Sequence, residues 1–204
     1  RTLRRFRINT ILRPILAEEA KTEVKQLEEL AAKSPKRVDL CRALVRCYDL
    51  LNQPAEARRV LDHWQTLEPT NRTLAIERIR RTPERAARIV GWQSMLQQTP
   101  ADPQLRLGLA EELLAAKDWV AARPILEPLT RTPTPSNAMA RAWAMLAACD
   151  LGEGKPAAAL AAFRQAEEKF PNWGKSALAQ TLLGQILQAT NESAQAKAAY
   201  LRAI

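Results

Sequence analysis

The chain of 204 residues has few of the side chains that build metal sites and nucleophilic active sites. It contains a single histidine, His63, and three cysteines, Cys41, Cys47 and Cys149. One imidazole excludes multi-histidine metal sites and gives little support to a cysteine–histidine nucleophile pair. An odd number of cysteines argues against a disulfide framework, and we interpret Cys41 and Cys47 as small core residues.

Glycine and long apolar runs are also scarce. The six glycines are scattered and form no phosphate-binding loop. The longest charge-free stretch, residues 176–191, contains Gln, Thr and Asn, and no segment meets the roughly 20-residue apolar requirement of a transmembrane helix. We therefore predict no enzyme activity, no catalytic residue, no metal, no cofactor and no small-molecule substrate.

The excess of basic residues is confined to two segments. Lysine and arginine number 31 against 22 acidic residues, a net charge of +9. Residues 1–21 and residues 72–90 each carry +4, so the remainder of the chain is almost neutral. This distribution predicts local contacts with acidic groups rather than a generally basic surface.

Prolines divide the chain at regular intervals. Pro35, Pro69, Pro100, Pro135 and Pro171 are separated by 34, 31, 35 and 36 residues, and each follows an apolar, helix-favouring stretch. Turn-forming residues also occur in the middle of these intervals, at residues 52–54, 117–119, 154–156 and 190–193, but not in the interval 69–100. The unit is thus a helix, a tight turn, a second helix and a stop. Alternating β-branched stretches are absent, which predicts an all-α chain.

These repeats resemble the tetratricopeptide repeat, whose pattern is Trp-x2-Leu-Gly-x2-Tyr, then Ala-x3-Phe, then Pro. The match is best at residues 140–173, with Trp143, Leu146, Ala159, Phe163 and Pro171 in register. The resemblance implies a helix-turn-helix solenoid of four to five repeats, one of them degenerate, in a right-handed superhelix. Small residues at the place of Ala159 allow the two helices of a repeat to approach closely.

The expected organisation follows from these registers. It comprises a basic amphipathic N-terminal segment 1–21, a leading helix 22–37, a repeat 38–71, a degenerate short repeat with a basic cluster 72–102, repeats 103–136 and 137–173, and an incomplete repeat 174–204. Pro124 and Pro128 lie in one expected helix, and Pro128 predicts a break or kink there, with a bend in the solenoid near residues 124–136.

The basic cluster is the first candidate for partner binding. Arg78, Arg81, Arg85 and Arg88 are spaced by three, four and three residues and share one face if their helix is continuous. Pro83 instead favours a new helix there, with Thr82 as N-cap and Pro83 at the first helical position. The cluster is either a solvated helix face or an electropositive patch for acidic protein segments or phospholipid headgroups.

Further candidates come from the resemblance and from the N-terminal segment. In tetratricopeptide repeats the first helix of each unit lines a concave groove, which places Arg42 and Arg46 there. Trp119 and Trp173 lie at expected turns and are the candidate exposed anchors. The N-terminal candidates are Arg4, Arg5, Phe6 and Arg7. That segment either docks on the solenoid or contacts a membrane, a protein or nucleic acid.

The sequence as a whole predicts a non-catalytic scaffold or assembly factor that binds a protein partner with an acidic or extended segment. The alternative is nucleic-acid or anionic-membrane binding through segments 1–21 and 72–90; nucleic acid is disfavoured because aromatic residues are not interleaved with the arginines. Residues 81–129 resemble the repeats of HemY-type and cytochrome c biogenesis membrane-associated proteins, which would make the basic start juxtamembrane. We expect a cytoplasmic or membrane-peripheral location, with an upstream signal or anchor left open because residue 1 is not Met.

Overall fold

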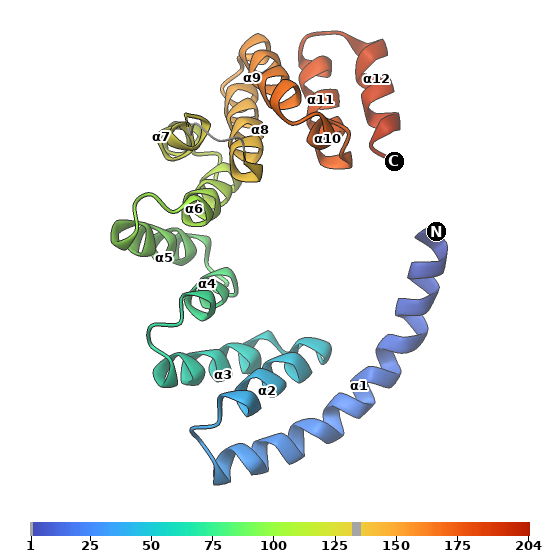
Figure 1. Ribbon diagram of the computed structural model, residues 1–204. Helices are drawn as coiled ribbons and strands as arrows, with labels where there is room; N and C mark the ends of the chain where they lie inside the picture. Colours follow the sequence, from blue (N-terminus) through green and yellow to red (C-terminus); the bar gives the residue numbers. More distant parts are fainter. Residues whose placement is uncertain (1, 132–135) are drawn as a thin grey trace. The chain divides into compact units, whose positions relative to one another are not determined.

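The computed structural model describes residues 2–131 and 136–204, with side chains described from Glu18 onward. These residues form helices and no strand, which confirms the all-α prediction. The helices are α1 (Thr2–Lys33), α2 (Val38–Leu50), α3 (Pro54–Leu67), α4 (Arg72–Arg80), α5 (Arg85–Gln98), α6 (Pro103–Ala115), α7 (Trp119–Thr130), α8 (Asn137–Gly152), α9 (Pro156–Lys169), α10 (Pro171–Gly174), α11 (Ala177–Ala189) and α12 (Ser193–Arg202) (Figure 1).

The chain divides between Pro83 and Glu84 into two compact units. Unit 1 contains α1 to α4, and unit 2 contains α5 to α12. The expected degenerate repeat is shared between them, because α4 packs against α3 and α5 packs against α6. The expected segments 1–21 and 22–37 form one helix, since α1 continues through both to Lys33.

Unit 1 is a row of helices around one apolar cluster. Helix α1 packs against α2, α2 against α3, and α3 against α4. The cluster includes Leu44, Ala57, Leu61 and Leu74, all buried. Burying these side chains stabilises the unit by roughly 1.5–3 kcal/mol for each large aliphatic residue.

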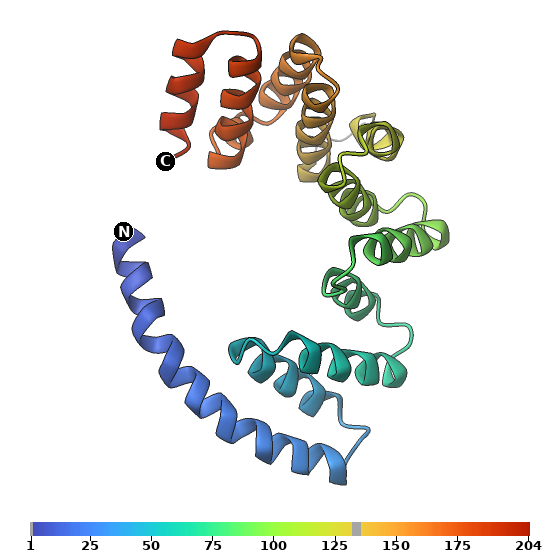
Figure 2. The same ribbon diagram turned by 180° about the vertical axis from the view of Figure 1, so that it is seen from behind.

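Unit 2 repeats the same pairing of neighbouring helices. Helices α6 and α7, α8 and α9, and α11 and α12 form hairpins, which lie side by side in both views (Figures 1 and 2). Ala122, Ala159 and Ala196, which follow the hairpin turns, are almost completely buried. The close approach of two helices expected at these alanines is confirmed.

The hairpin turns share one backbone conformation. Asn52, Lys117, Gly154 and Asn191 have positive φ angles of 55°, 61°, 75° and 63°. The residue after each donates its N–H back to the helix, for example Gln53 N to Tyr48 O at 2.8 Å. This is the Schellman motif, which ends a helix and reverses the chain. The turn signals in the sequence therefore mark the point where each first helix stops.

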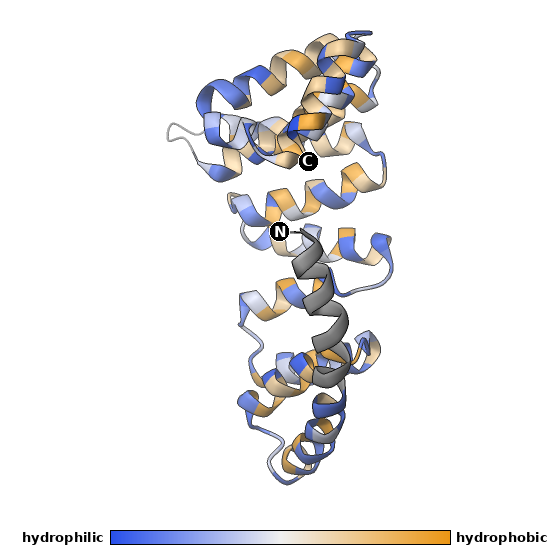
Figure 3. Cartoon of the chain, turned by 90° about the vertical axis from the view of Figure 1, so that its right-hand side faces the viewer, coloured by the Kyte–Doolittle hydropathy of each residue, from blue (hydrophilic) through white to orange (hydrophobic). Residues whose placement is uncertain are grey.

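Apolar and hydrophilic residues are mixed along the described helices (Figure 3). Within the described residues, no helix is long and apolar enough to cross a membrane.

Two local expectations are wrong. Helix α5 begins at Arg85 with Glu84 as N-cap, not at Pro83 with Thr82 as N-cap. The Thr82 hydroxyl instead donates to Arg78 O at 3.0 Å and so completes the end of α4. Helix α7 continues through Pro128 and ends at Thr130, so the expected break is not found; the ring removes the hydrogen bond that its own N–H would have donated to residue 124. The predicted kink and the bend at 124–136 stay predictions, and residues 132–135 lie outside the described part.

Replacing Gly108 with alanine is expected to destabilise unit 2. A Cβ at this buried position would lie 2.8 Å from two ring carbons of Trp92, and the buried indole cannot move away. The overpacking should lower the free energy of unfolding by about 1–3 kcal/mol, in spite of alanine's higher helix propensity. Urea denaturation followed by circular dichroism measures the change. Ser94→Ala, at an exposed position of α5, is the control and should leave stability unchanged or slightly higher; equal curves for G108A and wild type would contradict the packing argument.

Candidate functional site

A depression of about 410 Å³ lies in unit 1 where α2, α3 and α4 meet; we call it the α2–α4 groove. Buried Val45, Leu61 and Leu74 line it together with the polar side chains of Arg42 and Arg81. The groove exists because α4, a helix of nine residues, packs against α3 and much less closely against α2. In unit 2 the corresponding first helices, α6 and α8, are in direct contact.

Helical spacing brings the polar residues of α4 to the groove. Thr73, Glu77 and Arg81 recur every four residues and therefore lie on one face. Asn71 begins the helix, since its side chain accepts a hydrogen bond from Leu74 N at 3.1 Å. The N-cap thus fixes where α4 begins.

Arg42 carries the distinctive charge of the groove. Its guanidinium lies over the Trp64 ring, 5.5 Å from the ring centroid. The indole is held in place because Trp64 Nε1 donates to Glu68 Oε2 at 2.9 Å, and Asn71 Nδ2 donates to the same oxygen at 2.8 Å. Within the described part of the chain no carboxylate pairs with Arg42, so its N–H donors are directed to solvent while the ring supports the cation.

Arg81 closes the other end of the groove. Its two terminal nitrogens donate to the two carboxylate oxygens of Asp49, at 2.5 and 3.0 Å, and Glu77 lies 3.6 Å from its Nε. The hydrogen bond to Asp49 is the largest cause that raises the pKa of Arg81. Arg81 therefore serves first as a link between α2 and α4.

The four arginines of the predicted basic cluster do not share one helix face. Arg78 and Arg81 belong to unit 1, and Arg85 and Arg88 belong to unit 2, because the helix is interrupted between them. Arg78 pairs with Asp62 at 2.6 Å, and Arg85 and Arg88 pair with Glu112 at 3.9 and 2.8 Å. The helix is interrupted near Pro83 as expected, so no continuous basic face forms, and carboxylates of the same unit balance these charges. The role of the four arginines in partner binding stays a prediction.

The solved structures most informative about this arrangement are repeat proteins. A tetratricopeptide repeat protein from Parabacteroides merdae has a TM-score of 0.66 at 14% identity, over 98% of this chain and 81% of that chain. The C-terminal part of a TPR repeat-containing protein from Cytophaga hutchinsonii gives 0.64 at 13%, over 98% and 78%. MamA from Desulfovibrio magneticus RS-1 gives 0.60 at 17%, over 81% and 92%. The chain has the tetratricopeptide-repeat fold.

This fold is recognised from structure and residue pattern alone, since no family model and no curated protein matches the sequence. In a tetratricopeptide-repeat fold α2 and α4 are the first helices of successive repeats, so the α2–α4 groove corresponds to the expected concave surface. Arg42 lines this groove, and its role in partner binding stays a prediction. Arg46, one turn farther along α2, is exposed but is not among the lining residues.

The two tryptophans expected to be exposed anchors are half-buried. The ring of Trp119 lies directly against Gly152, where the missing Cβ leaves room for it. Trp173 packs against Phe163 with ring centroids 5.3 Å apart. Both rings contribute to packing within unit 2, so the expectation that these two tryptophans are exposed is wrong. Arg4, Arg5, Phe6 and Arg7 lie outside the residues whose side chains the structure describes.

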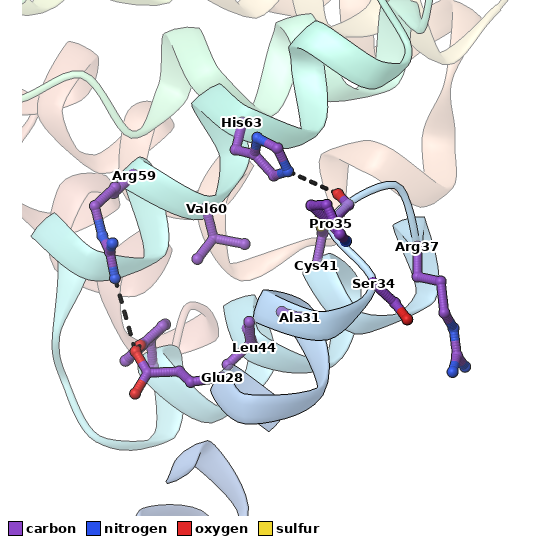
Figure 4. A pocket seen from close by; sticks show the side chains of 11 residues that line it. Glu28, Ala31, Ser34, Pro35, Arg37, Cys41, Leu44, Arg59, Val60 and His63 are labelled. Carbon is purple, nitrogen blue, oxygen red and sulfur yellow. Dashed lines mark hydrogen bonds and ion pairs between the residues drawn. The ribbon is translucent and has the colours of Figure 1, made fainter. Parts of the chain in front are cut away.

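A second depression of unit 1, about 260 Å³, lies between α1, α2 and α3 (Figure 4). Polar side chains that line it already have partners within the chain: Glu28 pairs with Arg59 at 3.7 Å, and His63 Nε2 lies 2.9 Å from Pro35 O. Burial raises the pKa of the Cys41 thiol, which therefore stays protonated and weakly nucleophilic. Neither this depression nor any other described cluster of acidic, cysteine or histidine residues forms a metal site.

Sequence reasoning missed the residues that complete the groove, Trp64, Asn71 and Thr73. Trp64 and Arg42 are 22 positions apart on different helices, and no local pattern predicts that they stack. Asn71 carried a signal that could have found it, since asparagine before a helical run is a common N-cap.

An ion-pair network on unit 2 offers a test of how its charges stabilise the fold. Arg123 donates to Asp150 at 2.6 Å and to Glu153 at 3.1 Å, linking α7 to the end of α8. Hydrogen bonds from Lys155 and then Arg123 lower the pKa of Glu153 below its ordinary value of 4.5. The ionised Glu153 carboxylate therefore stabilises the fold fully above pH 4.5, and this stabilisation is lost as pH falls through its lowered pKa.

Arg123→Gln is expected to lower the free energy of unfolding at pH 7 by about 1–3 kcal/mol, because the buried Asp150 loses its charged donor. The difference from wild type should shrink below pH 4.5. Urea denaturation between pH 3 and 8 measures it. Arg131→Gln, which removes an exposed pair with Glu127, should change stability by less than about 0.5 kcal/mol. A difference independent of pH would contradict the role of the Glu153 carboxylate.

Proposed function

We propose that the chain is a non-catalytic protein-binding scaffold that holds an extended, acidic segment of a partner in the α2–α4 groove. The observation that carries this proposal is Arg42, a cation supported by the Trp64 ring at the edge of an open groove and paired with no described carboxylate. The tetratricopeptide-repeat fold agrees with it, because such solenoids expose a large surface relative to their core.

The groove suits a peptide in chemical terms. Arg42 offers a planar fork of donors that matches a carboxylate in two hydrogen bonds. The apolar side chains of Val45 and Leu74 lie beside it and can receive every second side chain of an extended segment. The exposed Thr73 hydroxyl can bond the segment's backbone.

The chemistry of the other polar residues supports a binding rather than a catalytic role. His63 contacts a backbone carbonyl oxygen, and the pKa of each cysteine thiol is raised, that of Cys149 to about 11. The pairing of a general base with an ionised thiol, on which cysteine-based catalysis depends, is thus not assembled from these groups.

The alternative of nucleic-acid or anionic-membrane binding through residues 72–90 receives less support. Arg78, Arg81, Arg85 and Arg88 hold carboxylates, and releasing them for phosphate would break contacts within each unit. The membrane contact of residues 1–21, the HemY-type resemblance and a place in a larger membrane-associated complex stay predictions.

A photo-crosslinking amino acid placed at Thr73 tests the groove. In an extract of the native cell, crosslinks at Thr73 should capture a partner whose crosslinked peptide, identified by mass spectrometry, is rich in Asp and Glu. Arg42→Glu should reduce this crosslink at least tenfold, because it reverses the charge facing the segment.

Two controls make this test specific. Lys36→Glu causes the same change of net charge at an exposed loop position and should leave the crosslink intact. The same photo-crosslinker at exposed Gln26 of α1 reports random encounters. Equal capture at Thr73 and Gln26, or indifference to Arg42→Glu, would refute the groove.

A further inference from the structure

Unit 2 contains a depression of about 270 Å³ between α9, α11 and α12. Helices α9 and α12 each pack against α11 but much less closely against each other, so a gap remains above α11. Leu183 and Leu187 of α11 and Leu160 of α9 line it, and Arg164 and Arg202 stand on its two sides. We call this site the α9–α12 notch.

The two arginines of the notch differ from the other arginines of unit 2. Each of the others bonds to an acceptor in its own unit: Arg85 and Arg88 to Glu112, Arg106 to two backbone carbonyls, Arg123 to Asp150 and Glu153, Arg131 to Glu127, and Arg141 to Glu111. Among the described residues, Arg164 and Arg202 bond to none. The unpaired arginines of this unit thus line one and the same depression.

Glu167 also lines the notch, but among the described residues no ion pair joins it to Arg164 or Arg202. Its side chain lies against Gly174: a Cβ built there would be 3.0 Å from Glu167 Cγ and 3.2 Å from its Oε1. The missing Cβ at Gly174 therefore gives this carboxylate a place beside α10. The charge left across the notch is positive.

The equivalent depression in unit 1 is spanned by an ion pair of the chain itself. There the depression between α1, α2 and α3 has Glu28 on one outer helix and Arg59 on the other, and the two pair across it (Figure 4). In the notch the outer helices α9 and α12 both contribute arginine. Two arginines cannot close the gap with an ion pair, so the notch is open to an anionic group from outside the chain.

We propose that the α9–α12 notch binds a short segment of a partner protein in which an Asp or Glu stands next to a bulky apolar residue. The carboxylate bonds to Arg164 and Arg202, and the apolar side chain lies on Leu160 and Leu183, which are half-buried and partly open to solvent. The volume lies below the range of about 300–1,000 Å³ typical of cofactor and small-molecule pockets, which favours one or two side chains. This site lies on other helices than the α2–α4 groove and does not depend on it.

The test uses the intact chain and a phage-displayed library of random twelve-residue peptides. Selected peptides are synthesised with a fluorescent label, and their affinities are measured by fluorescence anisotropy. The Arg164→Gln/Arg202→Gln double variant should weaken the notch-binding peptides at least tenfold. It should melt like wild type by circular dichroism, because neither arginine bonds to another residue in the part of the chain that the structure describes.

Matched controls separate the notch from general charge and from the other groove. Lys169→Gln/Lys197→Gln removes the same charge from α9 and α12 at exposed positions outside the notch and should leave binding unchanged. Ala198→Trp fills the notch without a change of charge and should abolish binding. Arg42→Glu should leave these peptides bound, so failure of the α2–α4 groove and failure of the notch are told apart.

The outcomes decide the proposal. Peptides that lose binding in the double arginine variant, and again when their own Asp and Glu become Asn and Gln, support it. The proposal is overturned if no selected peptide responds to the double variant, or if responsive peptides bind equally well as amides. It is also overturned if only phosphatidylglycerol vesicles or single-stranded oligonucleotides lose binding in that variant.

Discussion

The structure depends on one constraint, the close antiparallel packing of two helices within each hairpin. Two devices make it possible: a residue with positive φ, such as Asn52 or Gly154, reverses the chain, and a small residue such as Ala57 or Ala159 lets the helices approach. The connection between α4 and α5, residues 81–84, has no residue with positive φ, and the chain divides into two units there.

Stacked hairpins leave gaps of two kinds, and both candidate sites arise from them. The α2–α4 groove lies between two helices that both neighbour α3, and the α9–α12 notch lies between two helices that both neighbour α11. Neither requires a specialised loop. The side chains beside each gap decide whether it is closed by the chain itself, as with Glu28 and Arg59, or left for a partner, as with Arg164 and Arg202.

A candidate binding site in this protein is therefore indicated by whether its arginines have partners, and not by the net charge of the segment. The basic excess in residues 72–90 suggested a patch, but Asp49, Asp62 and Glu112 take up those arginines across distances of 16 to 32 residues. Conversely, the almost neutral C-terminal part of the chain contains Arg164 and Arg202, for which the described residues provide no partner. Local net charge cannot predict this, since these particular ion pairs join residues of different helices.

The sequence by itself determined the helical fold, the hairpin turns and the small residues at the helix contacts, because these follow from short-range backbone preferences and a repeating apolar period. It also placed Arg42 on the groove through the repeat register. Only the tertiary structure decided that Arg42 lies on Trp64, that Trp119 packs on Gly152, and that Arg164 faces the same notch as Arg202. The physical reason is that these contacts join different helices, and their partners are chosen by how the hairpins stack rather than by neighbours along the chain.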